Sequence, residues 1–257
     1  MNCIEEYYNN FNEDERLSPR HNSIEYLTTM HYIEKYLPPN AKILEIGAGT
    51  GRYSVALADR GYDVTAVELI QHNIDVMKSK VKPNHNIKIH KGNAVNLPFL
   101  KSNSYDIVLL LGPMYHLFND TDKHNALKEA IRVAKKNSVI YVAYCNNDSP
   151  MYRRFVNGTI MDVMCEIDEN FHYKHTDTSI FENHRKEEID ELMAEYDVEK
   201  LHYVGTDMLA PFFSEQFDNM SDEIFELYMK YHYQICEKPD MLGFSFHMLD
   251  IFRKNKE

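Results

Sequence analysis

One glycine-rich stretch, Glu45-Ile46-Gly47-Ala48-Gly49-Thr50-Gly51, limits most strongly what this chain can fold into. The apolar run before it is typical of a strand, and residues from about 52 to 60 have a helical pattern. Glycines at such a junction let the backbone turn sharply and let a ligand approach closely. The free N–H groups that open the helix then face that ligand. The stretch therefore predicts a ligand-binding turn; a tight turn without a ligand is the alternative.

The spacing of these glycines separates the possible ligands. A dinucleotide-binding turn has the pattern G-x-G-x-x-G, and here Gly47 and Gly49 fit it but Arg52 takes the last position. No Gly-Lys-Ser/Thr follows, which excludes a phosphate-binding P-loop. A nucleotide-dependent oxidoreductase therefore remains an alternative that only the alternation of strands and helices supports.

That alternation runs from about residue 20 to about residue 145 and indicates βαβ units around a parallel sheet. We expect Asn137 to end the last helix of this part in a left-handed cap. The expected strands are 42–46, 64–68, 87–90, 107–111, 139–143, 198–204 and 243–252, and the expected helices are about 23–37, 52–60, 70–81, 127–134 and 185–195, with 206–238 largely helical.

Three further signals follow the expected strands, where ligands bind in open α/β sheets. Glu68 ends the second strand, and a carboxylate there can accept hydrogen bonds from both hydroxyls of a ribose. Gly92-Asn93-Ala94 follows the third strand, and an amide suits the edge of an adenine. Leu111-Gly112-Pro113-Met114-Tyr115-His116 follows the fourth. Taken singly, these are also compatible with an exposed charge or a plain turn.

Composition excludes several classes of protein. The net charge of −12 disfavours a broad surface for nucleic acid, which needs Lys and Arg to neutralise phosphates. No apolar run approaches the roughly 20 residues that span a bilayer, and the start lacks the features of a signal peptide. The cysteines at 3, 145, 165 and 236 form no CxxC pair, so we expect free thiols in a cytoplasmic protein.

Residues 41–145 resemble the class I S-adenosylmethionine-dependent methyltransferase family. The matching motifs, in the family's order, are Ile43 to Gly51, Ala66-Val67-Glu68, Gly92-Asn93-Ala94 and Tyr105-Asp106-Ile107-Val108. The resemblance implies a Rossmann-like, seven-stranded, mostly parallel α/β sheet with helices on both faces and an antiparallel C-terminal strand. We expect one domain over 1–257, with an N-terminal arm (1–22), a cofactor-binding core (41–145), and insertions (148–196 and 206–238) forming a substrate lid.

The resemblance also implies roles for single residues, with S-adenosylmethionine as cofactor. Leu111 and Gly112 lie beside its methionine part, and Asn93, with Ala94, reads the adenine amino group, although the family more often has Asp there. The remaining expected contacts are Glu45, Gly47, Ala48, Gly49 and Gly51 for the amino-acid end, Glu68 for the ribose and Leu69 for the adenine ring.

The expected reaction is methyl transfer to an O or N nucleophile of a small molecule. A protonated nucleophile needs a general base, and His116, with Tyr115 beside it, is the first candidate; a structural histidine is the alternative. Gly112-Pro113 stands where nucleic-acid amino-methylating members have Asn/Asp-Pro-Pro, which again disfavours nucleic acid. A binding module without turnover and a methyltransferase of protein substrates remain alternatives.

The walls of an acceptor pocket are expected from the two insertions. His172, His175 and His184 have no cysteine or close carboxylate to complete a metal site, so we expect no metal. The candidate pocket residues are Met151, Tyr152, Phe155, Met161, Met164, Phe212, Phe213 and Phe217, with packing in the core as their alternative.

Overall fold

The computed structural model describes residues 3–176 and 178–255 and shows one central sheet in the order β3-β2-β1-β4-β5-β8-β7. All neighbours pair in parallel except β8, which runs antiparallel to both β5 and β7. The expected sheet is confirmed. Its strands are β1 (Lys42–Ile46), β2 (Asp63–Glu68), β3 (Ile87–Lys91), β4 (Tyr105–Leu110), β5 (Ala134–Asn146), β7 (Val198–Gly205) and β8 (His247–Lys254), and a two-residue strand, β6 (Asn183–His184), pairs with β5.

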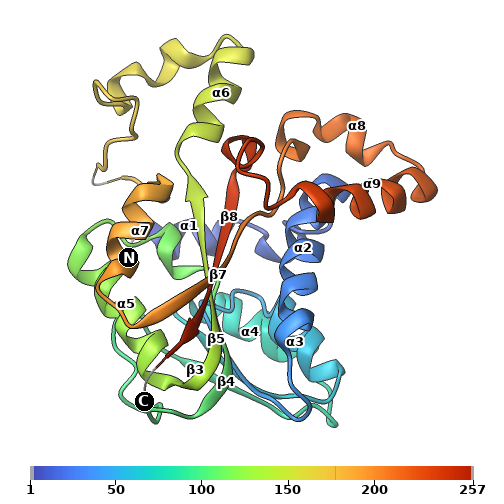
Figure 1. Ribbon diagram of the computed structural model, residues 1–257, viewed down its shortest axis with the longest axis vertical. Coiled ribbons are helices and arrows are strands. Elements are labelled where there is room, and N and C mark those ends of the chain that lie inside the picture. Colours follow the sequence, from blue (N-terminus) through green and yellow to red (C-terminus); the bar gives the residue numbers. More distant parts are fainter. Residues whose placement is uncertain (1–2, 177, 256–257) are drawn as a thin grey trace.

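Helices cover both faces of the sheet, with α2, α3 and α4 on one side and α5 and α7 on the other (Figure 1). The longer ones are α2 (Arg20–Tyr36), α3 (Arg52–Asp59), α4 (Gln71–Lys80), α5 (Asp120–Val133), α7 (Lys186–Ala194) and α9 (Asp222–Ile235). Shorter ones are α1 (Cys3–Asn10), α6 (Asp148–Val156), α8 (Ser214–Asp218) and the 3₁₀ turns η1 (Glu13–Glu15), η2 (Pro113–Tyr115), η3 (Ile160–Glu166), η4 (Ala210–Phe212) and η5 (Leu242–Phe244).

The central strands form the core because helices shield both of their faces. Ile43 and Leu44 of β1 and Leu109 of β4 are completely buried, as the unbroken apolar runs predict for parallel strands. Their carboxyl ends all point to one edge of the sheet, which is where β1 turns into the glycine loop. The functional signals of the sequence therefore gather at that edge.

Two local expectations need correction. Helix α5 ends at Val133, and β5 begins at once with Ala134, so Asn137 does not cap the helix. Asn137 does take the left-handed conformation (φ 62°), but inside β5, where the register with β4 shifts and the strand bulges. The short strand β6 has no period-2 pattern and is not foreseen from the sequence.

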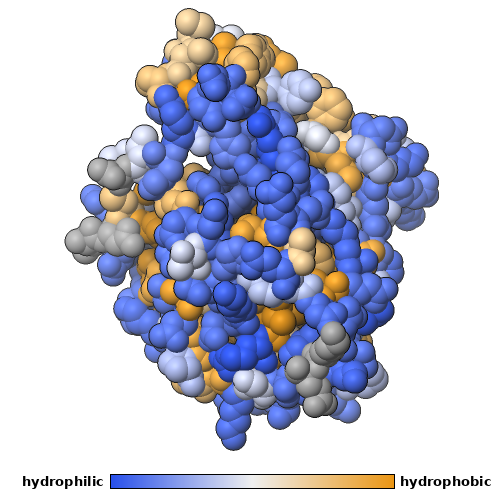
Figure 2. Space-filling view, turned by 60° about the vertical axis from the view of Figure 1, so that its left-hand side comes forward, coloured by the Kyte–Doolittle hydropathy of each residue, from blue (hydrophilic) through white to orange (hydrophobic). Residues whose placement is uncertain are grey.

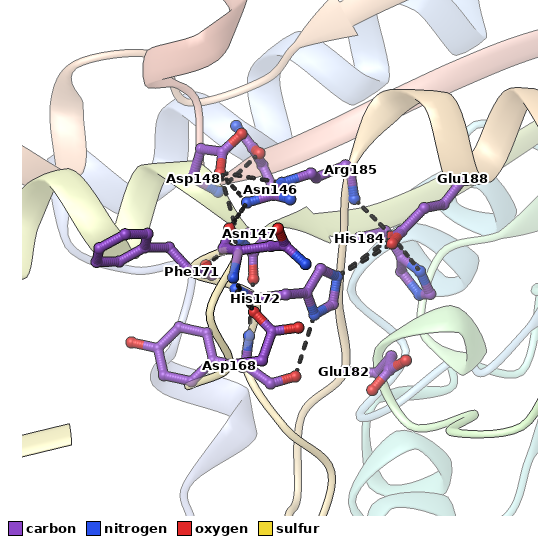
Figure 3. A network of polar contacts seen from close by, with 12 residues as sticks. Asn146, Asn147, Asp148, Asp168, Phe171, His172, Glu182, His184, Arg185 and Glu188 are labelled. Carbon is purple, nitrogen blue, oxygen red and sulfur yellow. Dashed lines mark hydrogen bonds and ion pairs between the residues drawn. The ribbon is translucent and has the colours of Figure 1, made fainter. Parts of the chain in front are cut away.

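The segment after β5 projects beyond the carboxyl end of the sheet, where α6 rises at the top of Figure 1. Polar contacts join the start of this segment to the residues where the chain returns to the sheet (Figure 3). Asn147 donates to the carbonyl of Phe171 (2.9 Å) and accepts from the Tyr173 N–H, while Arg185 contacts Asp148. This segment is therefore tied down at both ends.

Apolar side chains gather on the surface of this projecting segment, at the top of Figure 2. Four of the residues expected to line an acceptor pocket are exposed here, namely Tyr152, Phe155, Met161 and Met164. Phe213 is exposed as well, whereas Met151 and Phe217 are buried in the core. Within the described ranges, no helix is long and apolar enough to cross a bilayer.

Candidate functional site

The glycine loop joins β1 to α3 with three left-handed residues, Gly47, Gly49 and Gly51. The N–H groups of Gly47 and Ala48 both donate to the carbonyl of Val67 in β2, at 2.9 and 3.0 Å. A Cβ on Gly47 would stand 2.5 Å from Cδ of Pro113. Only glycine therefore allows the loop to turn here and to lie against the segment that follows β4.

The carboxylate of Glu68 fixes the next part of the loop. Its two oxygens accept hydrogen bonds from the backbone N–H groups of Gly49 and Ile70, each at 2.8 Å. Burial raises the pKa of Glu68, while these backbone donors and the Asn73 side chain oppose the shift. The end of β2, the glycine loop and the start of α4 thus form one hydrogen-bonded unit.

A cavity of about 300 Å³ opens at this edge of the sheet, at the lower end of the range for ligand pockets. The structure brings together ten of the eleven expected cofactor residues in its lining. They are Glu45, Gly47, Ala48, Gly49, Glu68, Leu69, Asn93, Ala94, Leu111 and Gly112. Gly51 lies outside the lining and packs against α4, where a Cβ would meet Met77 at 2.4 Å.

Glu45, the acidic residue of β1, also lines the cavity. Glu45 is 1% exposed and lines the cavity, and the Ser54 hydroxyl donates to its carboxyl group. Burial raises the pKa of Glu45 to about 8, although Ser54 works in the opposite direction. A positively charged ligand would reverse this burial penalty.

The polar atoms of the lining suit a nucleoside cofactor. Oδ1 of Asn73 is buried without a hydrogen-bond partner among the described residues, and Asn73 lines the cavity, so a ligand hydroxyl can satisfy it. Asn93 accepts the Val95 N–H (3.2 Å) through its side-chain oxygen, which leaves its NH₂ group and one lone pair for an adenine edge. Leu69 is 41% exposed at the same wall.

The N-terminal arm covers this cavity. Tyr8 of α1 and Glu13 and Asp14 of η1 all line it. Asp14 accepts from the hydroxyl of Thr50 (3.1 Å) and pairs with Lys80, which also donates to the Thr50 carbonyl. The arm is thus fastened directly to the glycine loop.

The two expected catalytic residues, Tyr115 and His116, also line the cavity, and His116 contacts Tyr8 of the arm. Nδ1 of His116 is 2.7 Å from the carbonyl of Ile180, so it carries the proton, and Nε2 accepts from the hydroxyl of Tyr8 (2.9 Å). Burial lowers the pKa of His116, so the ring is neutral at pH 7. Tyr115 is buried and faces the cavity. His116 therefore holds Tyr8, and with it α1, in place.

A second cavity of about 320 Å³ lies directly behind Tyr8 and Glu13, which line both cavities. None of the eight expected pocket residues lines this second cavity. Its aromatic wall comes from other elements: Tyr7, Tyr8, Phe11, Phe181 and Phe246.

Charged residues that were not expected from the sequence also line the second cavity, among them Arg16, Asp207 and His247. Arg16 is bidentate to Glu25 (2.7 and 3.2 Å) and also contacts Glu13 (2.8 Å). Asp207 and His247 pair at 2.7 Å. These residues lie far apart in the chain and carry no shared motif. In the described part of the chain, no three His, Cys, Asp or Glu side chains are arranged to hold a metal ion.

The comparisons agree with this geometry. Residues 43–137 match the family model of a methyltransferase domain. The demethylmenaquinone methyltransferase of Lysinibacillus sphaericus is 30% identical over 136 residues, which are 50% of this chain and 56% of that protein. Residues 43–137 are therefore a methyltransferase domain. Two of the solved structures with this fold are described as S-adenosylmethionine-dependent methyltransferases.

Solved structures show the same fold as the methyltransferase domain. A Thermotoga maritima protein, described as a possible histamine N-methyltransferase, aligns over 98% of this chain and 99% of its own, with 20% identity and a TM-score of 0.60. An S-adenosylmethionine-dependent methyltransferase of Methanosarcina mazei covers 88% and 98%, with 18% identity and a TM-score of 0.59. The chain spans only about half the length of the curated relatives it matches.

Proposed function

We propose that this protein transfers the methyl group of S-adenosylmethionine to an oxygen or nitrogen nucleophile of a small molecule. One observation supports the proposal: Tyr8 and Glu13 line both the cofactor cavity and the second cavity, so the two cavities lie next to each other. Ligands bound in the two cavities would therefore lie close together. An acceptor held in line behind an activated methyl group needs little more than orientation and exclusion of water.

Different residues of the chain would hold different parts of the cofactor. Glu45 and the loop of Gly47, Ala48 and Gly49 would hold the amino-acid end, which carries a positive ammonium group. Glu68 and Asn73 would hold the ribose, and Leu69, Asn93 and Ala94 would hold the adenine. Leu111 and Gly112, which follow β4 in the same lining, would lie beside the methionine part. The cofactor supplies an electrophilic methyl group when bound.

Tyr115 and His116 remain the proposed residues at the methyl end. Tyr115 lines the cofactor cavity and also a small cavity of about 20 Å³, room for one water, which His247 lines from the other side. His116 would position Tyr8, because both of its ring nitrogens are engaged. Tyr8 would in turn face both ligands.

A small acceptor is supported by the size of the second cavity, about 320 Å³, and by the names of the relatives. Several of the curated relatives are named demethylmenaquinone methyltransferases, and one solved structure is described as a possible histamine N-methyltransferase. The net charge of −12 disfavours nucleic acid. The cytosol stays the proposed compartment on the sequence argument alone.

Calorimetry with S-adenosylmethionine and S-adenosylhomocysteine, with NADH as the control ligand, tests the proposal. We expect binding of both sulfur ligands and none of NADH. Gly49→Arg should abolish binding without unfolding the chain, because a Cβ at Gly49 would meet only Glu13, at 3.8 Å, and the longer side chain would enter the cavity. Unchanged binding by this variant would contradict the proposed site. Release of S-adenosylhomocysteine with a pool of small molecules would exclude a binding module without turnover.

A further inference from the structure

Aromatic rings form much of the lining of the second cavity. Tyr7 stacks on Phe11 with ring centroids 5.2 Å apart, and Phe181 meets Tyr7 edge-on at 5.4 Å. Phe246, directly before β8, also lines the cavity. Aromatic walls of this kind bind a planar ring by stacking and edge contacts. The few polar groups among these aromatic side chains then determine which ligand binds.

Two of those polar groups, Asp207 and His247, are hydrogen-bonded to each other. Oδ1 of Asp207 accepts from the hydroxyl of Ser245 (2.7 Å) and from the backbone N–H groups of Phe246 and His247 (2.9 and 3.2 Å). Its other oxygen, Oδ2, lies 2.7 Å from Nδ1 of His247. The aspartate is therefore fixed by three donors and fixes the imidazole in turn.

This arrangement leaves one nitrogen of His247 for a ligand. Nδ1 faces two carboxylates, Asp207 at 2.7 Å and Glu25 at 3.3 Å, so it carries a proton. Nε2 makes no hydrogen bond within residues 3–176 and 178–255, and the ring lines the second cavity. A neutral imidazole with its Nδ1–H held by a carboxylate is a general base at Nε2.

The same cavity also has an exposed cation in its lining. Arg153 of α6 lines the cavity, is exposed, and makes no ion pair in the described part of the chain. Arg16, by contrast, is engaged by Glu13 and Glu25. Of these two arginines, Arg153 is therefore the one available to an anionic group at the mouth.

We propose that the second cavity binds a hydroxylated aromatic carboxylate, with its carboxylate at Arg153 and its hydroxyl at Nε2 of His247, which acts as the catalytic base. The proposal rests on the proposed methyl transfer. The hydroxyl proton goes to Nε2, and the oxygen forms its new bond to the methyl carbon of S-adenosylmethionine. The electrons of the broken S–C bond stay on sulfur, which gives S-adenosylhomocysteine and an aryl methyl ether. The imidazolium then releases its proton to water.

The first test is binding to the protein saturated with S-adenosylhomocysteine, measured by calorimetry. The probes are the three hydroxybenzoate isomers, with phenol and benzoate as analogues that each lack one group. We expect at least one isomer to bind, and Arg153→Gln to weaken it about tenfold or more while leaving phenol unchanged. Arg154→Gln is the matched control, because Arg154 does not line the cavity.

The second test follows the base. Glu25, Asp207, Glu13 and Arg16 surround His247, and the carboxylates raise the pKa of His247 despite its burial. Methyl transfer to the bound isomer should rise with pH through this pKa, and the imidazole NMR signal of His247 should titrate at the same pH. Asp207→Asn should move both inflections to lower pH, since it removes one negative charge. It should leave the affinity for S-adenosylhomocysteine unchanged.

Two outcomes would overturn the proposal. One is S-adenosylhomocysteine binding with no binding of any hydroxybenzoate isomer. The other is a pH inflection that moves with His116→Gln and not with Asp207→Asn. If the protein binds no S-adenosylhomocysteine at all, the proposed function itself fails, so the two failures are distinguishable.

Discussion

The backbone N–H of Gly49 and the carboxylate of Glu68 lie 2.8 Å apart, joining the glycine loop to the end of β2. The same carboxylate accepts from Ile70 at the start of α4. The residue expected to bind the ribose therefore also sets the shape of the loop expected to bind the amino-acid end. Two parts of the cofactor site depend on one side chain.

Glu68→Ala should weaken S-adenosylmethionine binding by roughly 1–3 kcal/mol, the scale for leaving buried polar partners unpaired. The variant removes the proposed ribose acceptor and frees the Gly49 and Ile70 N–H groups together. Calorimetric titration measures the loss. Glu68→Gln is the matched variant, because an amide oxygen can still accept one of these bonds. Equal affinity for Glu68→Ala and the unmodified protein would place the ribose elsewhere.

Binding of the cofactor should release protons through Glu45. Burial raises the pKa of Glu45 to about 8, so it is largely protonated at pH 7, and a cationic ligand favours its ionised form. Calorimetry at pH 7 in buffers of different ionisation enthalpy measures the released proton. The release should vanish in Glu45→Gln. Proton release that persists in this variant would assign it to another group.

The raised pKa of Glu45 also affects the free energy of unfolding of the protein without cofactor. The folded state keeps the Glu45 proton up to about pH 8, whereas an unfolded glutamate loses it near its ordinary value of 4.5. The folded state thus binds more protons across this interval, so the free energy of unfolding should fall as the pH rises from 4.5 to 8. Urea titrations at several pH values, repeated with Glu45→Gln, isolate this contribution.

Gly47→Ala should destabilise the fold by more than Gly158→Ala. Both glycines are left-handed, with φ 77° and 68°, so the backbone strain of an added Cβ is similar. A Cβ at Gly47 meets Pro113 at 2.5 Å, whereas one at Gly158 meets nothing within 4 Å. The midpoint of urea unfolding compares the two. Equal midpoints would mean that the loop and the segment after β4 can separate freely.

The fastening of the projecting segment should depend on pH through His172. Its Nε2 lies 3.2 Å from Glu188 of α7, and the hydrogen bond to Glu188 raises the pKa of His172 (Figure 3). Despite partial burial, contacts with His172 and Arg185 lower the pKa of Glu188 to about 2. The pair thus stabilises the segment above the ordinary glutamate pKa of 4.5, and is lost as the pH rises through the raised pKa of His172.

Amide hydrogen exchange of residues 168–185, corrected for the intrinsic pH dependence, measures this loss. Exchange should accelerate as the pH rises through the pKa of His172, and His172→Gln should remove the inflection. The neighbouring His184 serves as a control, because burial lowers its pKa to about 4, so it titrates well below this range. An inflection that survives His172→Gln would contradict this assignment.

The cofactor side of the site was predictable because its signals are local in the sequence. A strand, a glycine turn and a helix follow one another within about twenty residues, and parallel strands must end at a common edge. The carboxylate of Glu68 follows the same rule. Gly51 alone departs from the expectation, since it serves packing on Met77 and not the lining.

The lining of the second cavity was not predictable because its residues meet only through the fold. Arg16 lies before the first strand, and His247 opens the last one. No spacing rule joins them, and aromatic residues such as Phe155 and Phe246 look alike in sequence although one is exposed and the other lines a cavity. Asn137 shows the same limit locally, because its left-handed conformation suits both a helix cap and a strand bulge.

Helix α1 and turn η1 contribute Tyr8 and Glu13 to both cavities, yet neither pairs with the central sheet. A movement of this arm away from the cavities would therefore break no strand pairing. Reactants could enter and leave without disturbing the global stability of the domain. A bulky tag at the amino-terminal end of α1 would lie near the cofactor cavity, which Ile4 and Tyr8 line. A carboxyl-terminal tag is therefore the better choice for kinetic work.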